Sequence, residues 1–162
     1  MVRTPDTIQA VFREMGFPSA RAWLPGAVAY SVGRTYSLLI RELARVYGRH
    51  GLSAPSFNLL MLLRYGADPD RMTQQEVGKR LVVSASDMTG LIDRLEDKGL
   101  VRRTPGKDRR SKLLRITPKG ATLVGNVWPH HAETVKRLCG GLSQRDAHAL
   151  VRAAACLRER CG

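Results

Sequence analysis

The sequence predicts a mainly α-helical chain with one small β-hairpin, and three observations support this fold class. Apolar residues recur at helical spacing over most of the 162 residues, with glycine and proline as breaks between the periodic segments. Two short segments in the middle of the chain each begin with a capping pattern, and only two residues separate them. Directly after them, apolar residues and cations alternate on both sides of a Pro-Gly turn, which is typical of a β-hairpin.

Length and composition favour one globular domain over residues 1–162. Domains average about 100–200 residues, and the 43% hydrophobic and 25% charged residues do not fit a disordered basic tail. No apolar run has the length of a membrane span, and the N-terminus lacks the apolar segment of a secretory signal, so we expect a cytoplasmic protein. The three cysteines form no C-x-x-C pair, which argues against disulfides or a cysteine zinc site.

Three helices are predicted before the central unit. The first extends from Thr4 to Gly16, with proline in its first turn. The second is long, over about 27–47, and ends before a glycine. The third begins at Pro55 and ends at Gly66.

The next two helices carry the strongest local signals. Thr73-x-x-Glu76 is a capping box, in which the hydroxyl and the carboxylate satisfy free backbone amides at the start of a helix. Ser84-x-x-Asp87 resembles a second one. Two short capped helices joined by a turn of a few residues form a helix-turn-helix pattern.

The second of these helices has a predicted end that leads into the hairpin. Gly99 suits a left-handed position after the helix, and Leu100 is placed to pack on Leu95, as in a Schellman motif. Two short strands follow on either side of the turn at Pro105-Gly106. A helix-turn-helix followed by a basic hairpin is a winged helix, predicted over 52–117.

The C-terminal part predicts two more helices. Thr117-Pro118 begins a long one with a kink or break at Pro129, and Ser143-x-x-Asp146 caps the last. Cys156 falls on the apolar stripe of that last helix and is expected to be buried. Amphipathic stripes must be covered, so we interpret 1–50 and 118–162 as dimerisation helices.

Most of the positive charge falls in one segment, residues 98–119. This segment holds nine cations against one carboxylate, a net +8 out of the chain's +13. A membrane-binding basic helix would show helical periodicity and aromatic anchors, and the segment has neither. A solvated face is the other interpretation of a charged run, but the neighbouring helix-turn-helix favours nucleic acid.

Signals for catalysis or metal binding are weak. The chain has no P-loop, G-x-G-x-x-G, G-x-S-x-G or H-E-x-x-H motif. His130 and His131 are adjacent, so on a helix they diverge by about 100° and do not share a metal simply; we expect them to face solvent or an interface. The sequence therefore predicts neither an enzyme nor a cofactor nor a metal site.

Four motifs follow one another between Leu52 and Gly120. They are Thr73-x-x-Glu76-Val77-Gly78-x-x-Leu81, Arg94-Leu95-Glu96-x-Lys98-Gly99-Leu100-Val101-x-Arg103, Asp108-Arg109-Arg110-Ser111-Lys112 and Ile116-Thr117-Pro118-Lys119-Gly120. In this order they resemble the MarR family, the multiple-antibiotic-resistance type of bacterial winged-helix regulators. The flanking helices agree with that family in position but carry no diagnostic motif.

The resemblance implies a homodimer whose terminal helices entwine, with each winged helix on one half-site of a pseudo-palindrome in double-stranded DNA. The helix over 85–98 is expected to enter the major groove by its N-terminal end. The residues expected to contact DNA are Ser84, Ser86, Asp87, Thr89, Gly90 and Arg94 from the helix, and Arg103, Lys107, Asp108, Arg109, Arg110 and Lys112 from the hairpin.

Within the hairpin, the resemblance implies that Asp108 braces the tip while Arg109 or Arg110 enters an A·T-rich minor groove. Lys107, Arg103 and Lys112 are expected to hold phosphates. With about four phosphate contacts per subunit, the slope of log K against log salt should be about −7 for the dimer.

Two carboxylates oppose this interpretation of the helix, because Asp87 and Asp93 repel phosphate. Two explanations stay open. Either Asp87 accepts a hydrogen bond from a cytosine amino group, or the two aspartates pair with Arg94 or Arg80.

The resemblance also implies an effector, since members of the family bind aromatic or phenolic anions in a cleft beside the dimer helices, which lowers DNA affinity. The residues expected to line such a cleft are Trp23, Tyr30, Arg34, Phe57, Asn58 and Met61, with Arg34 or Arg94 pairing the anion. Core packing is the competing interpretation for Trp23, Phe57 and Met61. A weaker similarity to the urate-responsive branch rests on Trp23, on 53–58 and on Pro129-x-His131, but that branch has an acidic residue at the place of Asn58, which disfavours urate.

The sequence thus predicts a homodimeric, sequence-specific transcription regulator, a repressor that a small ligand releases from DNA. The alternative is a sequence-tolerant architectural DNA-binding protein, which would show no preference for a palindrome.

Overall fold

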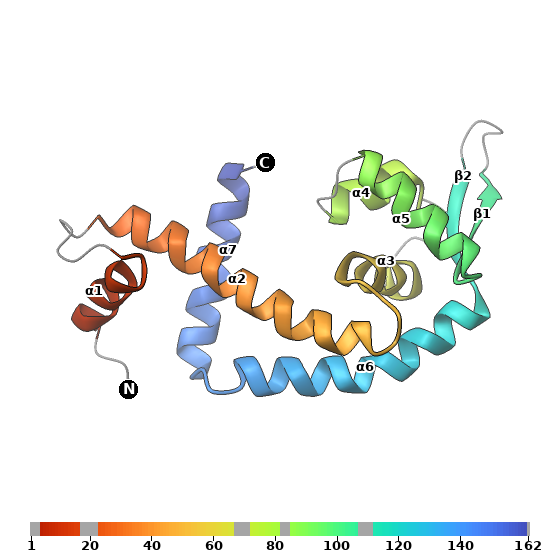
Figure 1. The fold of residues 1–162 in the computed structure, drawn as a ribbon. Coiled ribbons are helices and arrows are strands. Elements are labelled where there is room, and N and C mark those ends of the chain that lie inside the picture. Colours follow the sequence, from red (N-terminus) through yellow and green to blue (C-terminus); the bar gives the residue numbers. More distant parts are fainter. Residues whose placement is uncertain (1–3, 17–22, 67–71, 82–84, 107–111, 162) are drawn as a thin grey trace. The chain divides into compact units, whose positions relative to one another are not determined.

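The computed structural model describes residues 4–16, 23–66, 72–81, 85–106 and 112–161, and these form a mainly helical fold with one antiparallel hairpin (Figure 1). The predicted fold class is confirmed. The elements are α1 (Thr4–Glu14), α2 (Leu24–Gly48), α3 (Ala54–Tyr65), α4 (Gln74–Leu81), α5 (Ala85–Asp97), β1 (Val101–Pro105), β2 (Lys112–Ile116), α6 (Pro118–Cys139) and α7 (Gln144–Cys161). No helix in these ranges carries an apolar stretch long enough to cross a membrane.

The chain divides into two compact units, Met1–Glu42 and Leu43–Gly162. The first contains α1 and most of α2. Phe12 of α1 and Ala27 of α2 are buried in it, and the guanidinium Nε of Arg34 is 3.0 Å from a carboxylate oxygen of Glu14. That ion pair is exposed, so it contributes little to stability.

The second unit is built around α3, which contacts α4, α5, α6 and β2. Figure 1 shows α3 between α6 and the α4–α5 pair. Helix α3 is apolar on most sides, which is typical of a helix buried on more than one face, and Phe57, Leu59 and Leu60 are almost completely buried. The hydroxyl of Ser53 accepts a 3.3 Å hydrogen bond from the N–H of Ser56 and caps the helix.

The caps predicted for the central helices are present where the structure describes them. The Thr73 hydroxyl accepts a hydrogen bond from the N–H of Glu76 at 3.2 Å. After α5, Gly99 has a φ of +66° and donates to the Glu96 carbonyl at 2.8 Å, while Leu100 donates to the Leu95 carbonyl at 2.9 Å. These two bonds form the predicted Schellman motif. Ser84, the second predicted cap, lies outside the described residues.

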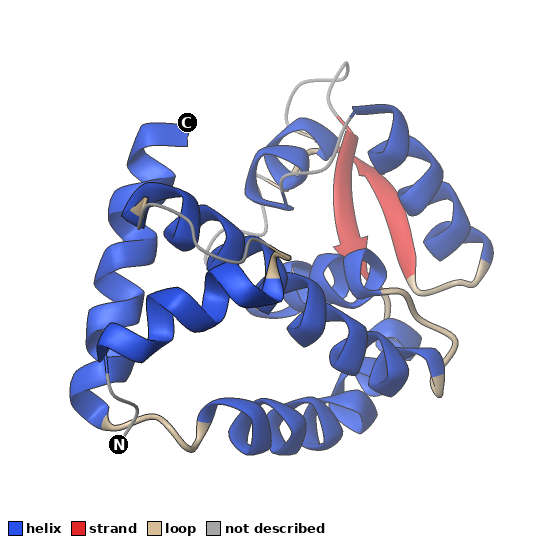
Figure 2. Ribbon diagram, turned by 60° about the vertical axis from the view of Figure 1, so that its left-hand side comes forward, coloured by secondary structure: helices blue, strands red, loops and turns tan. Residues whose placement is uncertain are grey.

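The hairpin is paired in regular register, from Val101 opposite Ile116 to Pro105 opposite Lys112. Figure 2 shows the two strands lying together. The chain just before α4 adds to this sheet, because the N–H of Leu114 donates to the Met72 carbonyl at 2.7 Å. A backbone hydrogen bond therefore links the chain at the start of the helix-turn-helix to the hairpin and helps to position one against the other.

Helix α6 continues through Pro129 to Cys139, so of the predicted kink or break, the break is wrong. Proline removes one helical hydrogen bond there. The helix is nevertheless held on both sides of the proline, by the buried Val127 before it and by His131 after it. Tertiary packing thus overrides the local signal.

The structure also bears on two other expectations about the C-terminal helices. Cys156 is exposed and α7 has no buried residue, so the predicted burial of Cys156 is wrong. For His131, which was expected to face solvent or an interface, solvent is wrong: the residue is half-buried, and its Nδ1 and the Tyr47 hydroxyl form a hydrogen bond of 2.9 Å. An interface at His131 stays a prediction. His130 is exposed and stacks on His50, with 5.7 Å between the ring centroids.

The Tyr47–His131 pair belongs to an aromatic cluster that joins the end of α2 to α3 and α6. The Tyr47 ring stacks on Phe57 with 4.4 Å between centroids, and Phe57 lies 5.1 Å from the His131 ring. Burial raises the pKa of Tyr47 to about 12. Burial also lowers the pKa of His131, because desolvation disfavours the charged imidazolium.

This lowered pKa predicts a loss of stability in acid. Below about pH 6.5, the ordinary pKa of histidine, unfolded His131 takes up a proton that the folded protein resists, so the free energy of unfolding falls. The loss is complete once the pH is below the lowered pKa of the folded state. Urea unfolding at several values between about pH 8 and pH 5 measures it. His131→Gln should flatten the pH profile, whereas His148→Gln, at an exposed position on α7, should not; equal profiles in both variants would contradict this assignment.

Candidate nucleic-acid interface

Helix α5 divides into an apolar and a polar face. Met88, Leu91, Ile92 and Leu95 are almost completely buried, and their i, i+3, i+4, i+7 spacing places them on one side of the helix. The residues with exposed side chains on the remaining surface include Asp87, Thr89, Asp93 and Arg94. Packing of the apolar face therefore determines which side chains α5 presents outward.

Gly90 and Arg94 lie one turn apart on this polar surface. The guanidinium Nη1 of Arg94 is 3.3 Å from the position that a Cβ on Gly90 would take. The arginine thus extends along α5 towards the N-terminal half of the helix, the part predicted to meet a groove.

A polar bridge joins the two helices of the helix-turn-helix. The amide Nε2 of Gln74 donates to the Thr89 hydroxyl at 2.7 Å, so the α4–α5 pair is linked on its exposed side. The sequence predicts that Thr89 faces DNA, but it does not predict that Gln74 binds Thr89. The only sequence signal for this role of Gln74 is its position directly after the capping residue Thr73.

The aspartate partners predicted from the sequence are partly wrong. Asp93 pairs with neither Arg94 nor Arg80 but with Arg103 of β1, at 2.6 Å between Nη2 and Oδ1. Arg80 pairs with Glu76 one turn away on α4, at 3.0 Å. Arg103 is ten residues from Asp93 in sequence, and the hairpin brings it back over α5.

Arg103 makes two further hydrogen bonds to the same helix. Its backbone N–H donates to Oε1 of Glu96 at 3.0 Å, and its Nη1 pairs with the Glu96 Oε2. The hydrogen bond to Asp93 raises the pKa of Arg103, and the charges of Glu96 and Asp93 act in the same direction. The guanidinium that was predicted to hold a phosphate is therefore occupied by two carboxylates in the free protein.

The remaining hairpin residues are only partly described. The side chains of Arg102 on β1 and Lys112 on β2 are exposed, and that of Arg115 is half-buried. Lys107, Asp108, Arg109 and Arg110, together with Ser84 and the side chain of Ser86, lie outside the described residues. The base of the hairpin is thus cationic on its outer surface, as the charge pattern predicts.

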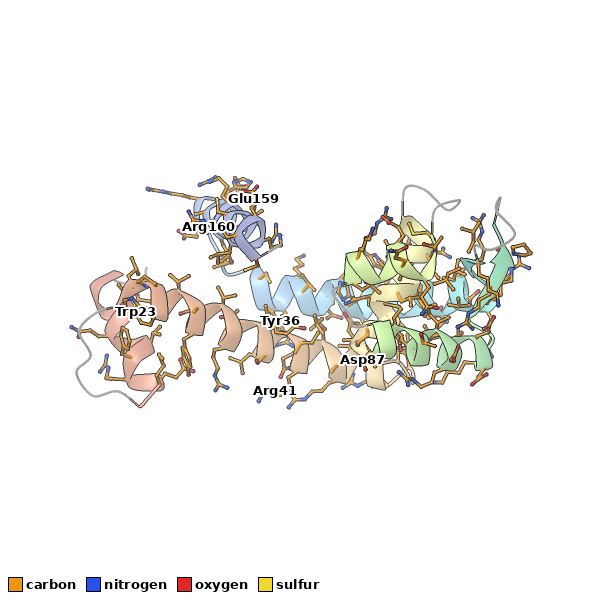
Figure 3. The ribbon with its side chains drawn as sticks, turned by 90° about the horizontal axis from the view of Figure 1, so that it is seen from above. Trp23, Tyr36, Arg41, Asp87, Glu159 and Arg160 are labelled. Atoms are coloured by element: carbon orange, nitrogen blue, oxygen red, sulfur yellow. The ribbon has the colours of Figure 1, made fainter. Side chains whose placement is uncertain are left out.

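The six predicted effector residues differ in accessibility. Trp23 is 67% exposed, so the core-packing interpretation is wrong for it, whereas Phe57 is 1% exposed and belongs to the core. Asn58 is exposed, Met61 and Tyr30 are half-buried, and Arg34 pairs with Glu14. Figure 3 labels Trp23, directly before the start of α2, and Tyr36 on α2. Trp23, Tyr30 and Arg34 lie in the first unit and the other three in the second.

Two terminal helices carry apolar side chains that the chain itself leaves uncovered. On α2 these are Leu24, Val28, Val32 and Tyr36, at intervals of four residues, and on α7 they are Leu150, Val151 and Leu157. Apolar stripes of this kind mark surfaces for association. Among the described residues, no group of three or more histidine, cysteine or acidic side chains is placed to hold a metal.

Comparison with known proteins agrees with the resemblance seen in the sequence. The MarR family profile matches residues 50–111. The chain is 30% identical over 123 residues to the HTH-type transcriptional regulator PecS of Dickeya dadantii, covering 75% of this chain and 74% of PecS.

Two solved structures share the fold. AbsC, a MarR family transcriptional regulator from Streptomyces coelicolor, has a TM-score of 0.77 and 25% identity, covering 84% of this chain and 93% of AbsC. BpsR of Bordetella bronchiseptica, whose DNA binding is regulated by 6-hydroxynicotinic acid, has a TM-score of 0.69 and 26% identity, covering 83% and 98%. PecS and AbsC are transcriptional regulators, which confirms the expectation of a non-enzymatic function.

Proposed function

The chain belongs to the MarR family of transcriptional regulators, and on that premise we propose that it is a homodimer that binds a pseudo-palindromic DNA operator, represses transcription there, and leaves DNA when a small aromatic anion binds. One observation carries the DNA-binding part. The apolar face of α5 is buried against its own unit, while its polar face and the cationic base of the hairpin are both outward. We assign 52–117 to DNA binding, and 1–50 and 118–162 to dimerisation.

DNA contact is proposed at two places on each subunit. The N-terminal half of α5 enters the major groove, and the hairpin tip reaches the adjacent minor groove. The first place comprises Ser84, Ser86, Asp87, Thr89, Gly90 and Arg94. The second comprises Lys107, Asp108, Arg109, Arg110 and Lys112. The net +8 of residues 98–119 supports this assignment, because phosphate neutralisation supplies most of the sequence-independent affinity.

The dimer is supported by the uncovered stripes on α2 and α7. A second copy of the chain is the partner that would remove these apolar side chains from water on both helices at once. A two-fold dimer would also place two copies of α5 about one DNA turn apart, roughly 10 base pairs, which explains a palindromic operator.

The effector part rests on the relative BpsR, whose DNA binding is regulated by an aromatic carboxylic acid. Of the candidate side chains, Trp23 and Asn58 are exposed and accessible to a ligand. Phe57 is not, because it is packed on Tyr47. An anion at Arg34 would compete with Glu14 for the guanidinium.

Selection of duplexes from a random-sequence library tests the proposed function. We expect the full chain to enrich a palindrome, and to sediment alone at about twice 18.0 kDa. The selected complex, challenged with 6-hydroxynicotinic acid and other aromatic carboxylates, should dissociate with at least one of them. Enrichment of no sequence would favour the architectural alternative, a monomer would remove the half-site argument, and a complex that resists every carboxylate would contradict the effector.

A further inference from the structure

Asp93 and Glu96 lie one turn apart on α5, close to the surface proposed to meet DNA, where carboxylates repel phosphates. Both are paired with a single residue of the hairpin, Arg103. We propose that Arg103 is a positioning residue, which clamps the wing, the β1–β2 hairpin, to α5 through Asp93 and Glu96. In this role Arg103 contributes to the specificity of DNA binding and not to the electrostatic attraction between the protein and the phosphates. This inference rests on the proposed DNA-binding function.

The connection between α5 and β1 explains why such a clamp is needed. Only three residues separate the last residue of α5, Asp97, from the first residue of β1, Val101, and the direction of the chain changes at Gly99. A short turn of this kind does not by itself determine the angle between α5 and the hairpin, so contacts between residues outside the turn must determine it. The two DNA-contacting parts must keep one relative position to reach adjacent grooves together.

Arg103 makes those contacts from the middle of β1. Its backbone N–H and its two terminal guanidinium nitrogens bind three carboxylate oxygens, two on Glu96 and one on Asp93. The arginine side chain is 23% exposed. The pair with Glu96, whose side chain is 36% exposed, is therefore screened less by salt than a fully exposed one. The planar fork of arginine fits two carboxylates in a way that lysine does not.

The clamp changes the electrostatic expectation for DNA binding. While Arg103 neutralises Asp93 and Glu96, it does not act as a free phosphate ligand. If Arg103 is not counted as a phosphate ligand, the number of phosphate contacts in a dimer is about six instead of about eight. The expected slope of log K against log salt therefore changes from about −7 to about −5.

The first test compares Arg103 with an arginine outside the proposed DNA-binding surface. Arg103→Gln should lower the affinity of the full-length dimer for its selected duplex about tenfold, with the salt slope unchanged. Arg49→Gln removes the same charge from an exposed position after α2 and should cost less than about threefold. A slope that becomes shallower by about 2 in Arg103→Gln would show a phosphate ligand and overturn the clamp.

The second test uses a change whose sign separates the two explanations. Glu96→Gln removes a negative charge near DNA, so simple electrostatics predicts tighter binding to every duplex. The clamp predicts weaker binding to the selected duplex, with unchanged or tighter binding to a scrambled duplex of the same composition. Tighter binding to both would overturn the inference.

Thermal unfolding of each variant, followed by circular dichroism, shows whether it is folded at the assay temperature. Lysine at position 103 provides a further comparison, because Arg103→Lys keeps the charge but loses the fork. It should behave like Arg103→Gln if the clamp is correct, and like the wild type if only charge matters. A wild-type chain that selects no duplex would instead contradict the proposed function, and with it the clamp.

Discussion

We expect replacement of both Arg109 and Arg110 by alanine to lower the affinity for the selected operator by about 100-fold at 0.15 M salt. The two arginines follow the turn of a segment that carries +8, and the dimer loses four cations in the variant. Loss of a groove contact costs about 1–3 kcal/mol. The dimer loses one such contact in each subunit, and the summed cost of the two is consistent with a loss of affinity of about 100-fold. The slope of log K against log salt should become shallower by about 2.

Titration of the selected duplex by fluorescence anisotropy at several salt concentrations measures both effects. The variant Arg13→Ala/Arg49→Ala is the matched control, because it removes the same number of charges at exposed positions on α1 and after α2. We expect it to change the affinity by less than about threefold, as for distant surface charges. Equal losses in the two double variants would show that only net charge matters, and unchanged affinity in the wing variant would contradict the wing hypothesis.

Gly120→Ala should lower the free energy of unfolding by about 1–3 kcal/mol, the usual cost of overpacking a core. Gly120 is buried in the first turn of α6, where its N–H donates to the capping hydroxyl of Thr117. A Cβ there would lie 2.2 Å from the carbonyl oxygen of Leu100 and 2.9 Å from Cγ1 of Ile116. Both are held in place, the first by the Schellman turn and the second by β2, so the structure has little room to adjust.

The opposite result is expected five residues further along the same helix. At Gly125 a Cβ would meet nothing within 4 Å, so Gly125→Ala should stabilise the chain by up to about 1 kcal/mol through helix propensity alone. Urea unfolding of the two variants measures the difference. Shifts of the same sign and size would contradict the close approach of α6 to the turn before β1.

The parts of the fold that could be predicted from the sequence are those with local signals. The Thr73 cap, the positive φ of Gly99 and the alternation of 101–105 with 112–116 each depend on a few neighbouring residues. The buried face of α5 followed from its spacing for the same reason. These features together were sufficient to recognise the winged helix.

The errors occurred where a distant contact outweighs a local signal. Pro129 predicts a kink or a break, yet the packing around Val127 and His131 keeps α6 helical through that position. The position of Cys156 on an apolar stripe predicts burial, yet Cys156 is exposed and no residue of α7 is buried among the described residues. For Asp93 the predicted partners, Arg94 and Arg80, were wrong, because ion pairing depends on distance in space and the hairpin brings Arg103 to Asp93.

By itself, the sequence determined the helices, the hairpin, the family and the location of the positive charge, because capping, helical periodicity and strand alternation act over a few residues and are written in consecutive positions. Only the tertiary structure decided that Arg103 binds Asp93 and Glu96, and that Tyr47 meets His131 across 84 residues of chain. Such pairs form because buried apolar faces bring their elements together, and the sequence carries no local record of which side chains then come within hydrogen-bonding distance.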